Sequence, residues 1–306
     1  MQNNLITDSN RGKELAGYLH ETFQTQGIHG RNDMPEDVLP TTMKRGSLEH
    51  LLFTTLTVSI DYQRDAERLW ECSRMTFEDS DTRYLFNPSD LHGTPMEKII
   101  LDMQKYGLSK KPSRDARIWS TVGISFHKKW EGDPRNFFED CGWDAITILR
   151  RLKMDNHSNN DSVTPDFLNL RGDKIGPLWL RMLRDNIGIS KLQNLDRIPI
   201  PVDIHIARAS LTLGIVRGKG VWTIKDIFEE IRKTWFESVE GLQTNSRSMI
   251  ALDVDEPLWH LSRYGCTKRD KETGHCPLYS SCEAKDYCIK GKINVDVGSN
   301  MVDLNT

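Results

Sequence analysis

The sequence carries little net charge, no long apolar run and no leader-like start. Its formal charge is −3 over 306 residues, which gives no overall sign of a polyanionic partner but leaves room for a local basic face. No apolar run approaches the roughly 20 residues that a membrane-spanning helix needs. The opening residues, MQNNLITDSNRGKELAG, lack the basic segment followed by an apolar one that marks a secretory leader. We therefore expect a soluble, cytoplasmic protein without a membrane partner.

Alternating runs of β-branched residues are also scarce, which argues against a β-rich fold. Apolar residues instead recur at helical spacing in six segments: residues 47–72, 116–130, 143–152, 178–184, 204–213 and 224–235. With 37% hydrophobic residues the chain can bury the core of one large or two small domains. The polar stretch 155–162, DNHSNNDS, is expected to be a loop and the residues after Lys292 a flexible end. The sequence predicts a mostly α-helical protein without internal repeats.

Only six cysteines are present, and two of them, Cys72 and Cys141, stand alone as ordinary packing residues. The others lie in one polar loop with the spacing C-x9-C-x5-C-x5-C: Cys266, Cys276, Cys282 and Cys288. In a reducing compartment, clustered thiols are metal ligands more often than disulfides. The paired C-x2-C knuckles of zinc ribbons are missing, so the loop favours a 4Fe-4S cluster over a zinc ion. His275 is a spare donor beside Cys276, which four thiolates leave unneeded.

A glycine-containing hairpin is predicted between two helices. Thr164 and Pro165 form a good helix start, with a capping hydroxyl followed by proline at the first helical position. The segment RGDKIG then supplies Gly172 and Gly176, and Pro177 is placed to begin a second helix. Such a hairpin can bring backbone N–H groups and a helix N-terminus close to a phosphate. A simple turn between two helices is the alternative.

Asp203 follows two prolines in the segment IPIPVDIHIARASLTLGIV, residues 198–216. Pro199 and Pro201 keep the chain extended before a helix that ends near Gly214. Aspartate is a favoured helix N-cap and needs no catalytic role at such a position. A local basic cluster, KYGLSKKPSRDAR at residues 105–117, is equally typical of a solvated helix end and of a phosphate contact.

The order of these features resembles the helix-hairpin-helix DNA glycosylase superfamily, especially its endonuclease III branch. The shared features are the glycine hairpin, the proline-flanked V-D-x-H-x-x-R segment and a cysteine loop preceded by LSRYGC, over residues 47–288. The resemblance implies a two-lobed fold with DNA between the lobes. Residues 47–197 would form a six-helix barrel-like domain ending with the hairpin motif. Residues 1–46 and 198–306 would form a second helical domain that carries the aspartate and the cluster loop.

The resemblance also implies a reaction, in which a base is flipped from duplex DNA and its bond to the sugar is cleaved. The family's aspartate maps onto Asp203, which would stabilise a cationic sugar and activate water. Members that also nick the strand carry a lysine where this chain has Leu178, whereas Lys174 lies before Gly176 in a different register. We therefore expect a monofunctional enzyme. A bifunctional glycosylase/lyase that uses Lys174 as nucleophile is the alternative, and Lys174 can also serve as a phosphate contact.

The cysteine loop departs from the family's C-x6-C-x2-C-x5-C pattern. Cys266 and Cys276 keep the separation of the family's first and third ligands, and Cys282 keeps the third-to-fourth interval. The missing second ligand falls at Thr273, so Cys288 would supply the fourth sulfur from a new place. The cluster would then fix a loop whose basic residues, Lys268, Arg269 and Lys271, contact DNA phosphates.

A second departure concerns the side chain that fills the gap left by a flipped base. Endonuclease III has a glutamine where direct register places Asp61 in the segment SIDYQRD. Tyr62 and Gln63 are better suited to enter a duplex, one by stacking and one by hydrogen bonding. Two residues at an ordinary helix end are the alternative. His205, which follows the aspartate by two positions, is expected to support the site rather than to bind metal.

Together these observations predict a monomeric, nucleoid-associated DNA repair enzyme that acts on double-stranded DNA. Damaged or modified pyrimidines are the expected substrates, by analogy with the nearest branch. Hypermodified bases of phage DNA are a second substrate class. The competing classes are a non-catalytic iron–sulfur DNA-binding protein and a zinc-stabilised helical module without a DNA role.

Overall fold

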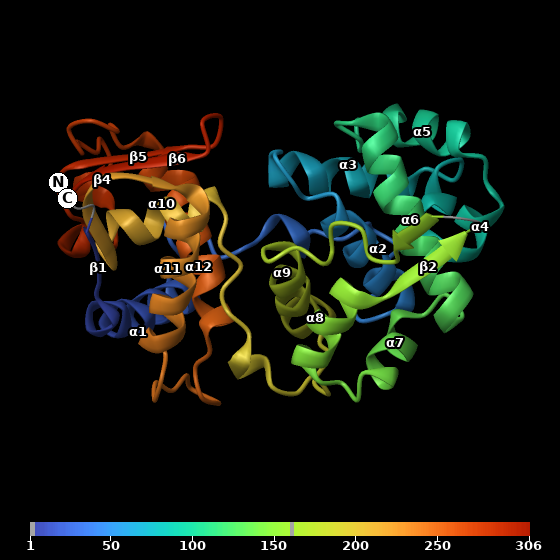
Figure 1. Ribbon diagram of the computed structural model, residues 1–306, viewed down its shortest axis with the longest axis horizontal. Coiled ribbons are helices and arrows are strands. Elements are labelled where there is room, and N and C mark those ends of the chain that lie inside the picture. Colours follow the sequence, from blue (N-terminus) through green and yellow to red (C-terminus); the bar gives the residue numbers. More distant parts are fainter. Residues whose placement is uncertain (1–3, 160–161) are drawn as a thin grey trace. The chain divides into compact units, whose positions relative to one another are not determined.

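The computed structural model describes residues 4–159 and 162–306. The chain forms two compact units (Figure 1), one continuous, Met34–Leu195, and one built from both ends of the chain, Met1–Asp33 with Asp196–Thr306. Helices dominate both units, which confirms the predicted mostly α class. Within the described residues, no helix combines the length and the apolar character that crossing a lipid bilayer requires.

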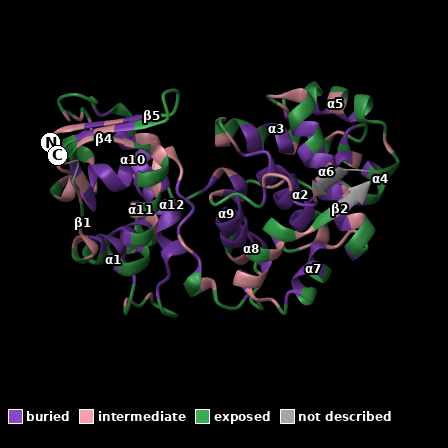
Figure 2. Ribbon diagram, in the orientation of Figure 1, coloured by how far each residue is buried: buried purple, intermediate pink, exposed green. Residues whose placement is uncertain are grey.

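The continuous unit is helical apart from one short hairpin. Its helices are α2 (Leu48–Ser59), α3 (Ala66–Glu78), α4 (Pro88–Gly93), α5 (Met96–Lys105), α6 (Pro112–Trp130), α7 (Pro134–Asp140), α8 (Ala145–Met154) and α9 (Ile175–Met182), with a π-helical turn η3 (Leu183–Ile187) and the 3-10 turns η1 (Pro35–Asp37) and η2 (Arg83–Phe86). Helices α2 and α9 are buried on nearly every side (Figure 2), as expected for helices that are apolar all round.

Aromatic rings form the core around these two helices. Phe53 on α2 packs against Trp70, Phe77 and Phe86 with ring centroids 5.4–5.9 Å apart. Phe138 on α7 packs against Trp179 of α9 at 5.4 Å. Rings of this size contribute much of the buried apolar area of a domain. The core therefore fixes where the ends of α2 and α9 lie.

The single helix predicted over residues 47–72 is wrong, because the chain turns between α2 and α3. Ser47 caps α2, whose last residue is Ser59. Gln63 then adopts a left-handed backbone with φ of 52°, which an α-helix cannot accommodate. Asp65 starts α3 by accepting a hydrogen bond from Arg68 N.

The prediction of a polar loop at residues 155–162 is also wrong, because strands lie at both ends of this segment. Strands β2 (Asn156–Asn159) and β3 (Ser162–Pro165) pair antiparallel as a short hairpin, and residues 160–161 lie outside the described residues. Thr164 and Pro165 therefore belong to a strand and do not start a helix.

The residues that follow β3 form consecutive turns in place of the first predicted helix. Arg171 N donates to Phe167 O in one helix-like bond, but Asn169 inside this turn takes a left-handed φ of 67°, which a regular helix does not contain. The second helix, α9, starts two residues earlier than predicted, at Ile175. The motif in this chain is thus a compact turn, a hairpin and one regular helix.

The second unit combines helices with a four-stranded antiparallel sheet. Its helices are α1 (Ser9–Thr25), α10 (Ile204–Thr212), α11 (Ile224–Ser238) and α12 (Asp255–His260), followed by the π-helical turn η6 (Leu261–Gly265) and short 3-10 turns through the cysteine loop. Its strands are β1 (Asn4–Thr7), β4 (Val216–Thr223), β5 (Lys292–Asp296) and β6 (Met301–Asn305). The strand order is β1-β4-β6-β5.

The sheet joins the two ends of the chain, and the flexible end predicted after Lys292 is wrong. Asn4 and Asn305 both pair with Lys219 of β4, and Figure 1 shows the C-terminus at this sheet. Residues Ile293, Val295, Val302 and Leu304 of the C-terminal hairpin are buried. Burial of this alternating face stabilises the two strands. The sequence did not predict them because polar residues alternate with the buried ones.

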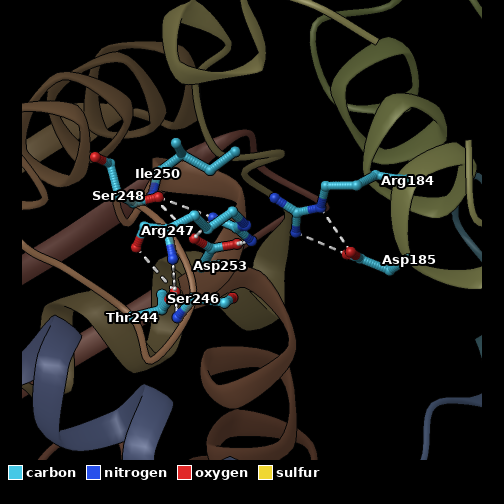
Figure 3. A network of polar contacts seen from close by, with 8 residues as sticks. All are labelled: Arg184, Asp185, Thr244, Ser246, Arg247, Ser248, Ile250 and Asp253. Atoms are coloured by element: carbon cyan, nitrogen blue, oxygen red, sulfur yellow. Dashed lines mark hydrogen bonds and ion pairs between the residues drawn. The ribbon is translucent and has the colours of Figure 1, made fainter. Parts of the chain in front are cut away.

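Two arginine–aspartate pairs, one in each unit, form two-pronged hydrogen bonds (Figure 3). In the second unit, Arg247 binds Asp253 through two N–H···O bonds of 2.7 and 2.6 Å, and Asp253 also accepts Ile250 N at 2.9 Å. In the continuous unit, Arg184 binds its neighbour Asp185 in the same two-pronged way, at 2.6 and 2.7 Å. Paired bonds of this type fix orientation better than a single contact does.

Candidate functional site

The four clustered cysteines line one small cavity. Cys266 starts the loop directly after η6, and all four thiols are free of disulfides. The remaining wall of the cavity is mostly apolar, from Leu213, Leu261, Leu278 and Ala284. Four sulfurs that face one space within a single loop are a donor set that fits an iron–sulfur cluster.

Burial of the cysteine thiols changes their pKa values. Burial raises the pKa of Cys266 to about 12, and the neighbouring Cys282, Cys288 and Cys276 raise it further. Burial likewise raises the pKa of Cys282 to about 11. Thiolates this close to one another in an apolar setting repel each other, and bound cationic metal removes that repulsion. The cavity therefore fits the predicted metal centre.

The new spacing of the loop has a structural explanation. Thr273, which stands where the family has its second ligand, is exposed, and its N–H and hydroxyl both donate to Asp270 Oδ1 at 2.7 and 2.8 Å. Cys288 instead reaches the cavity because the next residue, Ile289, is anchored by a 2.9 Å bond to Thr212 O. His275 is exposed and does not line the cavity.

Arg269 differs from the expectation that it contacts DNA. It is 7% exposed, and its guanidinium donates to Ile289 O and Gly291 O, each at 3.0 Å. The side chain therefore holds the loop together from inside. Lys268 and Lys271 are exposed and remain predicted phosphate contacts.

Helix α10 connects the candidate aspartate with the cysteine cavity. Asp203 caps the helix as predicted, since its Oδ1 accepts His205 N at 2.8 Å and Ile206 N at 2.9 Å. Its side chain is half-buried. The other end of the helix reaches the cavity wall through Thr212. A nine-residue helix is about 13 Å long, so the cavity supports the scaffold of the aspartate from a distance.

His205 and Arg208 face the interior from the same helix. His205 Nδ1 lies 3.3 Å from Ser262 Oγ, and its ring lies 5.8 Å from that of Trp259. These contacts dock α10 on the segment that leads to Cys266, which matches a supporting role. Burial lowers the pKa of Arg208, and the nearby charges of Cys266 and Asp203 partly offset that effect. Arg208 thus interacts with both the aspartate and the first cysteine.

In the continuous unit, the glycine-containing hairpin before α9 packs on the end of α2. Lys174 caps α9, and its Nζ lies 3.0 Å from Asp61 Oδ2. Asn169 Nδ2 donates to Ser59 O across the same junction. The hairpin and the loop after α2 are therefore one structural element, although more than a hundred residues separate them in the chain.

The two hairpin glycines allow close packing rather than unusual backbone angles. A Cβ at Gly176 would lie 2.8 Å from Leu149 Cδ2 and 3.1 Å from Leu170 O, which leaves no room for a side chain. Gly172 N donates to Asn169 O, and Gly176 N donates to Gly172 O. These two N–H groups serve the hairpin itself. Leu178, where the family's lyases carry lysine, is 7% exposed and packs in the core.

Tyr62 and Gln63 lie against the basic cluster of the sequence. The Tyr62 ring has Arg114 Cζ at 4.4 Å and Lys111 Nζ at 5.2 Å from its centroid. Lys110 Nζ donates to Gln63 O and Lys111 Nζ to Gln63 Oε1, both at 2.8 Å. An aromatic ring, an amide and three cations therefore share one surface, which suits a nucleic acid better than a plain helix end does.

A buried aspartate holds this surface in place. Asp115, 1% exposed, accepts hydrogen bonds from the Tyr62 hydroxyl, from Ser109 Oγ and from the backbone N–H groups of Lys110 and Lys111. Burial and the hydrogen bond to Asp115 raise the pKa of Tyr62 to about 12.

A separate cavity of about 500 Å³ between α2, α4 and the end of α6 contains none of the predicted site residues.

Two solved structures resemble the chain over most of its length. One is a trapped endonuclease III–DNA covalent intermediate, an estranged-adenine complex, with a TM-score of 0.51 and 15% identity over 92% of this chain and 99% of that chain. The other is a non-covalent endonuclease III–DNA complex, with a TM-score of 0.51 and 16% identity over 92% of this chain and 98% of that chain. The chain has the endonuclease III fold. No protein-family model matches the sequence, and no curated protein does.

Sequence reasoning did not identify several residues that complete these sites within the endonuclease III fold. The sequence shows Lys110 and Lys111 only as members of a basic cluster, because their contacts with Gln63 span 47 and 48 positions of the chain. Asp115 was noted only as a charge within that cluster, although it organises the surface. His29, which reaches the cysteine loop, had no sequence signal at all.

Proposed function

We propose that this protein is a DNA glycosylase that flips a damaged or modified base, most simply a pyrimidine, out of duplex DNA and hydrolyses its N-glycosidic bond to leave an abasic site. The observation that carries the proposal is Asp203, a half-buried carboxylate held at the start of α10 in a chain with the endonuclease III fold. Both endonuclease III structures compared above are complexes with DNA, and the Tyr62–Gln63 surface has the groups that nucleic acids bind.

Asp203 would act on the sugar as the base departs. Cleavage of the glycosidic bond builds positive charge on the sugar ring, and a fixed carboxylate stabilises that charge. The bonds from His205 N and Ile206 N fix the Asp203 carboxylate through Oδ1. Such a carboxylate needs little reorganisation in the transition state. It can also accept a proton from the attacking water.

Water rather than lysine is the proposed nucleophile. The residue in the lyase register is the buried Leu178, which has no amine. Lys174 precedes Gly176 in a different register, and its Nζ is bound by Asp61 Oδ2 at 3.0 Å. We therefore assign Lys174 to positioning of the hairpin and to phosphate binding in a monofunctional enzyme.

The proposed cofactor is a 4Fe-4S cluster bound by Cys266, Cys276, Cys282 and Cys288. When bound, the cluster would cross-link the loop through its four thiolates. Hydrolysis of the glycosidic bond transfers no electrons, so we assign the cluster a structural role and not a redox role. Lys268 and Lys271, exposed on the same loop, would then face DNA phosphates. The proposed working form is a monomer on double-stranded DNA.

The decisive test uses duplexes that carry single oxidised, deaminated, mismatched or hypermodified bases. Each duplex is incubated with the iron-loaded protein and then treated with alkali to cut abasic sites. The proposal expects alkali-dependent cleavage of at least one modified duplex and none of the unmodified duplex. DNA binding without cleavage across the whole panel would favour the non-catalytic class. Iron and zinc analysis of the purified protein separates a brown iron–sulfur protein from a colourless zinc protein.

A further inference from the structure

The cavity lined by the four clustered cysteines also has two buried hydrogen-bond donors in its wall. Thr212, the last residue of α10, and Arg269, three residues after Cys266, both line it. They are 3% and 7% exposed. Thr212 Oγ1 and Arg269 Nε have no hydrogen-bond partner among the residues that the structure describes. Buried donors without a partner are energetically unfavourable, so a group that fills this cavity is expected to accept from them.

The Thr212 hydroxyl lacks the usual partner of a threonine within a helix. Thr76 and Thr234, which are equally buried on other helices, donate to the backbone carbonyl four residues earlier, at 2.7 and 2.6 Å. Thr212 makes no such bond to Arg208 O, although α10 is helical up to this residue. Its hydroxyl is therefore available to a group in the cavity.

The backbone around Arg269 holds its guanidinium in one place. Nη2 donates to Ile289 O and Gly291 O, each at 3.0 Å, which fixes the group against the segment that follows Cys288. Gly274, with a left-handed φ of 74°, passes so close that a Cβ there would lie 2.5 Å from Nη2 and 2.8 Å from Gly291 O. The two carbonyl bonds use Nη2 alone and leave Nε without an acceptor.

The electrostatics of the cavity associate each donor with one thiol. Burial raises the pKa of both Cys266 and Cys288, because a thiolate is poorly solvated in this wall. The Thr212 hydroxyl partly offsets this effect at Cys266, and the Arg269 guanidinium partly offsets it at Cys288. Both donors thus favour the thiolate, which is the form that binds iron.

We propose that Thr212 and Arg269 donate hydrogen bonds to the ligand sulfurs of the iron–sulfur cluster, Thr212 at Cys266 and Arg269 at Cys288. This inference rests on the proposed cluster but not on glycosylase activity. Hydrogen bonds to the sulfurs stabilise the more negative, reduced state and so make the reduction potential more positive. Because hydrolysis of the glycosidic bond does not use this potential, it serves here only as a measure of the two bonds.

The test measures the reduction potential and the resonance Raman spectrum after anaerobic reconstitution with iron and sulfide. Thr212→Val keeps the side-chain shape and removes the hydroxyl. Arg269→Lys keeps the positive charge but places a methylene where Nε stands. Each variant should keep a full cluster and have a more negative potential than the wild type. The iron–thiolate stretching bands should shift in deuterated water in the wild type and shift less in each variant.

Two substitutions of the same kind are the matched controls. Thr267→Val removes a hydroxyl one residue after Cys266, but that hydroxyl donates to Arg263 O at 3.0 Å and Thr267 does not line the cysteine cavity. Arg11→Lys changes another arginine whose charge acts on Cys288, but its Nε already donates to Leu213 O at 2.6 Å and it too is outside the cavity wall. Neither control should change the potential or the response to deuterated water.

Each outcome decides a separate question. A full cluster at the wild-type potential in Thr212→Val and Arg269→Lys overturns the inference, as do equal shifts in the matched controls. A wild-type protein that takes up no iron overturns the cofactor itself and this inference with it. Circular dichroism checks folding. If Arg269→Lys does not fold or does not take up iron, the pair Thr212→Val and Thr267→Val takes the same measurements, and equal potentials in that pair overturn the inference.

Discussion

Lys174 Nζ lies 3.0 Å from Asp61 Oδ2, so the one lysine of the hairpin is paired with the residue that stands where endonuclease III carries a gap-filling glutamine. The side chains are 28% and 10% exposed. A partly buried pair holds its geometry better than an exposed one. The two departures of this chain from the family pattern, a displaced lysine and an acidic residue at the end of α2, therefore compensate each other in space.

This pairing predicts the absence of lyase activity. The wild-type protein should form no covalent adduct with abasic or modified DNA in the presence of borohydride, because Leu178 provides no amine and the amine of Lys174 is bound by Asp61 in a different register. Asp61→Asn removes the counter-ion and should still give no adduct, since the register of Lys174 is unchanged. An adduct in the wild type that disappears in Lys174→Ala would show that the lysine is the nucleophile.

Asp203→Asn should separate chemistry from folding. Asparagine caps helices about as well as aspartate, so the free energy of unfolding should change by less than about 1 kcal/mol and DNA binding should persist. Loss of the negative charge should lower the excision rate by at least about 100-fold, the scale of other transition-state charge effects. Asp8→Asn, which alters the N-cap of α1 in the same unit, is the matched control and should leave excision unchanged. Normal excision by Asp203→Asn would exclude the assignment.

Tyr62 is predicted to stack on DNA when a base leaves the helix. Base–aromatic stacking contributes about 1–3 kcal/mol, so Tyr62→Ala should reduce the flipped population by about 5- to 150-fold, measured by 2-aminopurine fluorescence next to the target base. Tyr62→Phe keeps the ring and loses only the bond to Asp115, so it should retain most of the signal. Equal losses in both variants would indicate that the hydroxyl anchor matters and that stacking does not.

His50 should make the stability of the protein sensitive to acid. The side chain is fully buried and its Nδ1 accepts Gly46 N at 3.0 Å, which requires neutral imidazole. Burial, with a smaller effect of Arg45, lowers its pKa from 6.5 to about 4. The unfolded chain therefore takes up a proton below pH 6.5 that the folded chain refuses until pH 4. The stabilisation is complete above pH 6.5 and is lost as the pH falls toward 4, by on the order of 3 kcal/mol.

Urea unfolding at pH 7.5, 6, 5 and 4.5 measures this effect. His50→Gln cannot titrate, so the difference in unfolding free energy between the wild type and this variant should shrink steadily with falling pH. His20→Gln is the control, because that histidine lies on a different helix, α1. A pH-independent difference between the wild type and His50→Gln would rule out His50 as the source.

The sequence by itself determined the helical class, the N-cap position of Asp203 and the register that places Leu178 where lyases carry lysine. Each depends on local chemistry: apolar residues at helical spacing, a carboxylate directly before a helix, and a fixed count from the glycine hairpin. The same local signals misled where neighbours along the chain did not decide the outcome. The polar residues of β2 and the alternating residues of β5 and β6 form strands because distant partners supply the hydrogen bonds and the apolar cover.

Only the tertiary structure brought together the residues on which the sites depend. Lys174 meets Asp61 across 113 positions, Lys111 meets Gln63 across 48, and His29 meets Glu283 across 254. A local pattern carries no information about such pairs, because the packing of α2 against α9 and of the first turn against the cysteine loop sets their distances. The sequence thus determined which groups are available for chemistry, whereas burial and long-range packing decided which of them act together.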